Sequence, residues 1–123
     1  MEKNIVILAI VGGRDYNDYN TFKTIVDNYI NEITPESYPD FIVSGGAKGV
    51  DSLAENYALE HNISMKIYKP DWSKGKRAGL ERNTDIINIS THVLALPTKN
   101  SRGTYDSINK AKQQNKILKI VNV

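Results

Sequence analysis

The strongest structural signal in the sequence is the stretch over residues 4–11, which is apolar without a break from Ile5, is rich in β-branched side chains and ends at two glycines. A strand that is apolar at successive positions has both faces buried. This is the situation of a central strand in a parallel sheet that helices cover on both sides. The run therefore predicts a fold in which strands and helices alternate along the chain.

The rest of the chain follows that alternation. Apolar residues recur at helical spacing in residues 21–33, 50–60, 77–89 and 104–115. Short apolar runs predict further strands over residues 41–44, 64–69, 91–96 and 116–123. We expect one α/β domain over residues 1–123, a Rossmann-like three-layer α/β/α sandwich around a parallel five-stranded sheet. The expected strand order, 3-2-1-4-5, places a ligand crevice at the carboxyl ends of the first and fourth strands.

Composition excludes several classes of protein. The chain has 123 residues, of which 40% are hydrophobic and 24% charged, as in ordinary globular domains. Its longest apolar run is far shorter than the roughly 20 residues of a membrane span, and no secretory signal is recognisable. We therefore expect a cytoplasmic protein with no membrane partner. With no cysteine and only two histidines, neither a metal site nor a cofactor is expected.

Three glycine-bearing turns follow the first, second and fourth predicted strands, so they share one rim of the sheet. Their residues are Gly12, Gly13 and Arg14; then Ser44, Gly45, Gly46, Lys48, Gly49 and Asp51; and finally Gly103 and Thr104. Glycines let backbone N–H groups converge on an anion, and each turn leads to a helix whose first N–H groups are unpaired. Either glycine pair alone is typical of a tight turn, but the three together predict a phosphate-binding site.

Other side chains near this rim have two interpretations each. Tyr16 can stack on a nucleobase or cover a helix, and Thr104 can donate its hydroxyl to a ligand or cap the last helix. Trp72 can stack on a base or pack its loop down, and packing is favoured. The charged stretch over residues 74–83 is typical of a solvated loop and helix start, although an asparagine within a helix needs some compensation.

The order of these motifs resembles the SLOG superfamily, and within it the YspA-like branch of small single-domain proteins from bacteria and phages. The motifs are Gly-Gly-Arg-(x)3-Asp from Gly12, Ser-Gly-Gly-Ala-x-Gly-Val-Asp from Ser44, Ala-Gly-x-x-Arg-Asn ending at Asn83, and Gly-Thr-x-Asp ending at Asp106. The resemblance implies a Rossmann-like fold that binds nucleotides or nucleotide-derived ligands at the glycine rim. It also implies that Arg82 and Asn83 face the pocket.

One motif departs from the LOG-type phosphoribohydrolases of the same superfamily. Those enzymes have Pro-Gly-Gly-x-Gly-Thr-x-x-Glu, whose Glu acts on the glycosidic bond. Here Ser107 occupies the position of that Glu, and Asp106 lies about 100° away around the helix. Whether the chain is an enzyme is therefore left open, and the candidate catalytic residues are Asp106 and Asp51.

Three functions are compatible with these residues. The first is a binding module that senses or sequesters a signalling nucleotide in a bacterium or phage. The second is hydrolysis of the N-glycosidic bond of a nucleoside monophosphate. The third is DprA-like binding of single-stranded nucleic acid through Lys74, Lys76, Arg77, Lys110, Lys112 and Lys116, which ranks last because the net charge is only +2 and no aromatic ladder accompanies these residues.

The helix over residues 77–89 also bears on assembly. Its apolar residues Ile86, Ile87 and Ile89 form a broad face that a second copy of the chain can cover. We expect a homo-oligomer on this basis, although an interior face of the same helix would explain these residues equally well.

Overall fold

The computed structural model describes residues 4–123, in which strands and helices alternate in the expected order. The elements are β1 (Ile7–Gly12), α1 (Tyr19–Ile33), β2 (Phe41–Ser44), α2 (Val50–Glu60), β3 (Ser64–Ile67), a short 3-10 turn η1 (Trp72–Lys74), α3 (Ala78–Ile89), β4 (His92–Leu96), α4 (Arg102–Gln113) and β5 (Ile117–Ile120).

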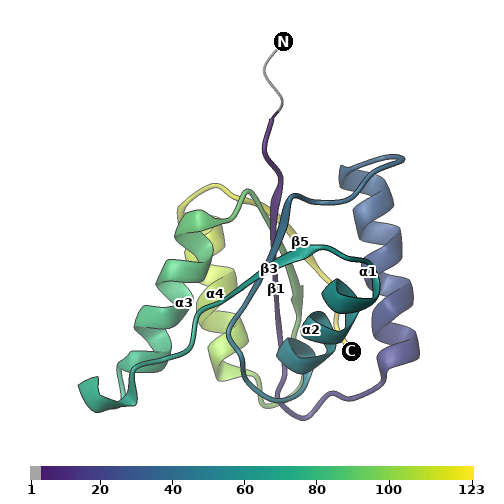
Figure 1. Cartoon of the computed structure of the whole chain (residues 1–123). Coiled ribbons are helices and arrows are strands. Elements are labelled where there is room, and N and C mark those ends of the chain that lie inside the picture. Colours follow the sequence, from purple (N-terminus) through teal and green to yellow (C-terminus); the bar gives the residue numbers. More distant parts are fainter. Residues whose placement is uncertain (1–3) are drawn as a thin grey trace.

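The five strands form one parallel sheet in the order β3-β2-β1-β4-β5, so the expected fold class and strand order are confirmed. Ala9 in the central strand is in register with Val43 of β2 and Val93 of β4. Helices α1 and α2 lie on one side of the sheet, and α3 and α4 lie on the other (Figure 1). The order reverses between β1 and β4, which is where open α/β sheets form their ligand crevices.

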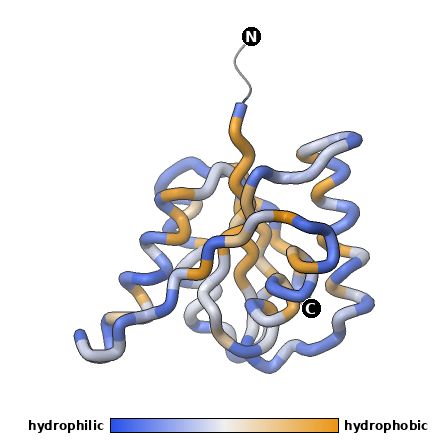
Figure 2. Tube along the Cα trace, viewed as in Figure 1, coloured by the Kyte–Doolittle hydropathy of each residue, from blue (hydrophilic) through white to orange (hydrophobic). Residues whose placement is uncertain are grey.

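Burial of both faces of β1 explains the apolar run with which the sequence begins. Leu8 and Ile10 pack in the core beneath α1 and α2, whereas Ala9 and Val11 pack in a second core beneath α3 and α4. The hydrophobic track of the central strands is plain in Figure 2. Ile86 and Ile87 belong to the second core, so the interior explanation accounts for the apolar face of α3. The homo-oligomer stays a prediction without that support.

Most element boundaries differ from expectation by a few residues, and two of the differences have a clear cause. Strand β1 begins at Ile7 because the Val6 N–H donates to the Asp40 carboxylate (2.8 Å) instead of joining the sheet. Helix α4 begins at Arg102, two residues early, with Ser101 at the N-cap position. Thr104 is thus a buried residue within the first helical turn, and the interpretation of Thr104 as the cap is wrong.

The lengths and composition of the helices bear on membrane insertion. Within residues 4–123, no helix combines the length and apolar character that crossing a bilayer requires.

Candidate functional site

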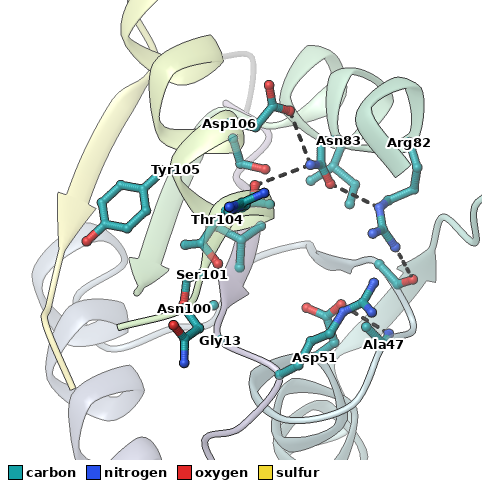
Figure 3. Close-up of a pocket in the computed structure, with 18 of the residues that line it drawn as sticks. Gly13, Ala47, Asp51, Arg82, Asn83, Asn100, Ser101, Thr104, Tyr105 and Asp106 are labelled. Carbon is teal, nitrogen blue, oxygen red and sulfur yellow. Dashed lines mark hydrogen bonds between the residues drawn. The ribbon is translucent and has the colours of Figure 1, made fainter. Parts of the chain in front are cut away.

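A cavity of about 1020 Å³, here called the main cavity, opens at the carboxyl ends of β1, β2 and β4. The three glycine-bearing turns line it together, as Figure 3 shows for one side of the site. Of the residues singled out from the sequence, those in its wall are Gly12, Gly13, Arg14, Gly45, Asp51, Arg82, Asn83, Gly103, Thr104, Asp106 and Ser107. The topology thus assembles one site from segments that are far apart in the sequence.

A second cavity of about 610 Å³, here called the side cavity, adjoins the first next to β3 and η1. Gly46 and Lys48 line only this cavity, together with Lys69 and Trp72. Four residues line both cavities: Arg14, Gly45, Ala47 and Arg82. The two cavities therefore meet at the two arginines and the turn that follows β2.

Gly49 has a structural explanation that the sequence did not provide. It lies outside the walls of both cavities, and its backbone has a φ of +73° that favours glycine. A Cβ at this position would lie 2.3 Å from the Gly13 carbonyl oxygen. The next residue, Val50, donates its N–H to the same oxygen (3.1 Å). Gly49 thus lets the turns after β1 and β2 pack backbone against backbone.

Ser44 and Tyr16 also lie outside both cavity walls. Ser44 is fully buried at the end of β2, where its carbonyl accepts the Tyr68 N–H (2.8 Å). Tyr16 is half-buried and packs against the core beneath α1 and α2. This position fits its interpretation as a residue that covers a helix, and stacking of Tyr16 on a base stays a prediction.

A chain of hydrogen bonds crosses the main cavity from the β2 turn to α4. The Arg82 guanidinium donates to the Gly45 carbonyl oxygen (2.6 Å) and to the Asn83 side-chain oxygen (3.0 Å). The Asn83 amide in turn donates to the Gly103 carbonyl oxygen and to the Asp106 carboxylate, each at 3.2 Å. Figure 3 shows both side chains pointing from α3 toward these partners. These bonds compensate for an asparagine within a helix, which the sequence left unexplained.

Asp106 is held by a second contact besides Asn83. Lys110, one helical turn later, forms an ion pair with the Asp106 carboxylate at 2.7 Å. Lys110 also donates to the Leu80 carbonyl oxygen (2.8 Å). Ser107, at the position of the LOG-type Glu, lines the same cavity but is almost wholly buried.

Asp51 is the buried acidic residue of the main cavity, with 8% of its surface exposed. Its carboxylate accepts the Ala47 N–H (3.1 Å). Burial raises the pKa of Asp51 above its ordinary value, and this effect outweighs the opposing effects of the Ala47 N–H, the Arg82 charge and the Ser44 hydroxyl. Asp51 is therefore easier to protonate than an exposed carboxyl.

The two arginines of the site act on each other. Burial is the main cause that lowers the pKa of Arg82, and the nearby positive charge of Arg14 lowers it further, while Asp51 raises it. Within residues 4–123 the exposed Arg14 makes no hydrogen bond or ion pair. Its guanidinium is thus available to a ligand at the junction of the two cavities.

The polar loop after β4 contributes more than sequence reasoning assigned to it. The Thr98 hydroxyl donates to the Asp15 carboxylate (2.6 Å), and the Thr98 N–H donates to the Ser101 hydroxyl (2.7 Å). These bonds join the loop to the turn after β1. Further residues of the main cavity that were not predicted are Asp15, Ala47, Lys99, Asn100, Ser101, Arg102, Tyr105 and Asn109. Asp15 and Ala47 belong to the turns after β1 and β2, whereas the other six follow β4, a place that puts their segment on the same rim and was the available signal.

The segment between β3 and α3 supplies part of the wall of the side cavity, through Lys69, Pro70 and Trp72. Trp72 lies close to Gly79 of α3 yet is 58% exposed, so the packing interpretation holds only for part of its ring.

Among residues 4–123 there is no cluster of three His, Asp or Glu side chains that could hold a metal ion.

Comparison with known proteins places the chain in a family and finds solved structures of similar fold. Residues 6–75 match the model of the YspA, cpYpsA-related SLOG family. The Gene 61 protein of Mycobacterium phage D29 is 30% identical over 113 residues, an alignment that covers 86% of this chain and 88% of that protein. Arg82, Asn83, Gly103 and Thr104 lie beyond the residues that the family model matches.

Among solved structures, the DNA processing protein A (DprA) from Streptococcus pneumoniae has a TM-score of 0.73 at 19% identity, covering 94% of this chain and 50% of that chain. The structural-genomics target TM1055 has a TM-score of 0.67 at 16% identity, covering 93% and 72%. The chain spans half the length of DprA. At these identities, both likenesses show a shared Rossmann-like fold.

Proposed function

We propose that this chain, which belongs to the YspA, cpYpsA-related SLOG family, binds a nucleotide or nucleotide-derived ligand in its main cavity. The phosphate lies at the glycine-rich turns, and the whole chain acts as one nucleotide-binding domain. The ligand is held without turnover, as a protein that senses or sequesters a signalling nucleotide would hold it.

The observation that carries this proposal is the pair of guanidinium groups at the junction of the cavities. Arg14 and Arg82 line both cavities, and Arg82 is partly buried, so an anion bound between them meets two charged donors where water is partly excluded. A phosphate also accepts paired hydrogen bonds from a guanidinium. Arg82 is already fixed by its bond to Gly45, whereas Arg14 has its donors available.

Neighbouring groups complete the binding site for such a ligand. Lys48 adds a positive charge beside the turn after β2, and the first N–H groups of α4 point out of the helix end at Gly103 and Thr104. Asp51 lines the same cavity and is suited to accept a hydrogen bond from a ribose hydroxyl.

Thermal unfolding with a panel of ligands tests the proposal. The panel contains AMP, GMP, cyclic nucleotides, ADP-ribose, NAD and a short single-stranded oligonucleotide. A ligand at a hundred times its dissociation constant adds about 2.7 kcal/mol to the free energy of unfolding. For a domain of this size, that raises the unfolding temperature by several degrees. Arg14→Ala should weaken binding by about 1.5–3 kcal/mol, the value of a hydrogen bond to a charged group.

Lys112→Ala is the matched control, because this exposed lysine lies outside both cavity walls. It should leave the shift unchanged. If no member of the panel raises the unfolding temperature, or if Arg14→Ala binds as the unaltered protein does, the proposal is wrong.

A second candidate function is hydrolysis of an N-glycosidic bond, which the raised pKa of Asp51 favours. Buried carboxyls with raised pKa values in a cavity are typical of general acids. In this reaction water adds to C1′ of the ribose while the bond to the base breaks, and the base leaves with a proton. Asp106 is less suited to this role, because its carboxylate is already held by Lys110 and Asn83.

Chromatography of AMP and GMP incubated with the protein separates the two candidates. Free base that appears with the unaltered protein but not with Asp51→Asn supports hydrolysis. Binding without any release of base supports the binding module instead.

A further inference from the structure

We propose that the side cavity is a second subsite and that the ligand is a dinucleotide, two nucleosides joined through phosphate. One nucleoside occupies the main cavity, the other lies against Trp72, and the linking phosphate lies between Arg14 and Arg82. This inference rests on the proposed function and specifies its ligand class.

The charges of the two cavities differ in the way such a ligand requires. Basic residues of the side cavity are Arg14, Lys48, Lys69 and Arg82, and no Asp or Glu among residues 4–123 lines it. The main cavity has basic residues Arg14, Arg82, Lys99 and Arg102 but also acidic residues Asp15, Asp51 and Asp106. The positive potential is therefore concentrated in the side cavity and at the junction, which favours phosphate at the junction rather than deep in the main cavity.

The two cavities adjoin at that junction. Arg14 and Arg82 belong to both walls, as do Gly45 and Ala47. A phosphate bound by the two guanidiniums is therefore in contact with both spaces. The side cavity, at about 610 Å³, lies within the usual range of roughly 300–1,000 Å³ for small-molecule sites, so a nucleoside fits there.

Trp72 is positioned in advance for stacking. The 3-10 turn that carries it is fixed by Asp71, whose carboxylate accepts the N–H of Ser73 (3.1 Å) and the Ser73 hydroxyl. A Cβ added to Gly79 would lie 3.5 Å from the indole ring, so the ring rests on the first turn of α3. More than half of the side chain remains exposed, and an aromatic side chain held in this way beside basic residues is a platform for a base.

Lys69 is held over the turn that follows β2. The Tyr68 N–H donates to the Ser44 carbonyl oxygen (2.8 Å), which continues the pairing of β3 with β2 beyond Ile67. The side chain of Lys69 then crosses Gly46, where an added Cβ would lie 3.2 Å from its Cγ and 3.4 Å from its Cε. Its ammonium group is thereby kept near the turn that lines both cavities.

Calorimetric titration with AMP, ADP and diadenosine diphosphate tests the proposal, and the guanosine series is measured in the same way. Diadenosine diphosphate should bind at least tenfold more tightly than ADP, because only the dinucleotide brings a second base. The phosphodiester dinucleotide pApA is measured beside it. Tighter binding of pApA identifies a nucleic acid end as the source of the dinucleotide, and tighter binding of the pyrophosphate identifies a free dinucleotide.

Trp72→Ala should weaken dinucleotide binding by about 5- to 150-fold, the range for loss of one stacked base. It should leave AMP affinity within about twofold, since AMP fits the main cavity alone. Trp72→Phe should restore most of the dinucleotide affinity, and Tyr105→Ala, which removes an exposed aromatic ring of the main cavity, should not reproduce this pattern. Thermal unfolding without ligand confirms that each variant is folded.

The outcomes separate the two proposals. If AMP binds but dinucleotides bind no better than ADP, or Trp72→Ala weakens all ligands equally, the second subsite is wrong and the proposed function stands. If neither mononucleotides nor dinucleotides of either series bind, both proposals are wrong.

Discussion

The two cavities are built from side chains of different kinds. In the main cavity, the polar side chains of Arg82, Asn83 and Asp106 bond to one another and to backbone, and Asp51 is buried. In the side cavity, Lys48, Lys69 and Trp72 are exposed. The wall of the main cavity therefore carries part of the stability of the fold, whereas the side cavity has side chains that can be changed with little effect on folding.

The largest expected effect follows from replacing the glycine beneath the main cavity. Gly49→Ala should lower the free energy of unfolding by about 3 kcal/mol or more, because it combines a left-handed backbone with a 2.3 Å contact to the Gly13 oxygen. Gly75→Ala, in the segment beside the side cavity, has a similar φ of +88° but nothing within 4 Å. It should cost only about 1–2 kcal/mol. Urea denaturation measures both, and equal losses would contradict the backbone-to-backbone packing described for Gly49.

The next largest effect distinguishes the two arginines. Arg82→Ala should destabilise the protein by about 1.5–3 kcal/mol, because it removes charged hydrogen bonds to Gly45 and Asn83. Arg14→Ala should change stability by less than about 0.5 kcal/mol and act on ligand binding alone. Denaturation without ligand compares the two variants. A destabilised Arg14→Ala would show that this residue also supports the fold.

Asp51 allows the buried wall of the main cavity to be tested by pH. Its pKa is raised in the folded protein, so between the ordinary value of 3.8 and the folded pKa the native state holds a proton that the unfolded state releases. Its contribution to stability is present below 3.8 and is lost as pH rises through the folded pKa. Relative to Asp51→Asn, the unaltered protein should therefore lose stability as pH rises through this window. A difference that is constant with pH would contradict the assignment.

The smallest effect is expected in the side cavity. Lys48→Gln combined with Lys69→Gln should change the free energy of unfolding by less than about 0.5 kcal/mol, because both side chains are exposed. The same pair should make ligand binding less sensitive to salt, since two charges near the ligand are removed. Unfolding curves and titrations at two salt concentrations measure this. A clear loss of stability would mean that the two cavities do not differ as described.

Sequence patterns predicted the order of the elements, the strand order and the common rim of the glycine turns. These features could be predicted because the signals for them are local in the sequence. The buried run before Gly12 and the glycines after each strand act on neighbouring residues, and right-handed connections between parallel strands leave few topologies. The departure at Ser107 was likewise visible in the sequence alone.

Contacts between distant residues were decided by the tertiary structure. Arg82 and Asn83 find their partners at Gly45 and Asp106, in segments that meet only when α3 and α4 pack side by side on the sheet. Gly49 belongs to the contact between two turns, which no local pattern distinguishes from a phosphate loop. The sequence by itself determined where strands and helices form, because backbone propensity and apolar spacing are local. The side cavity and the proximity of Arg14 to Arg82 could be seen only in the tertiary structure. Like charges and exposed rings do not attract one another, so packing elsewhere in the molecule brings them together.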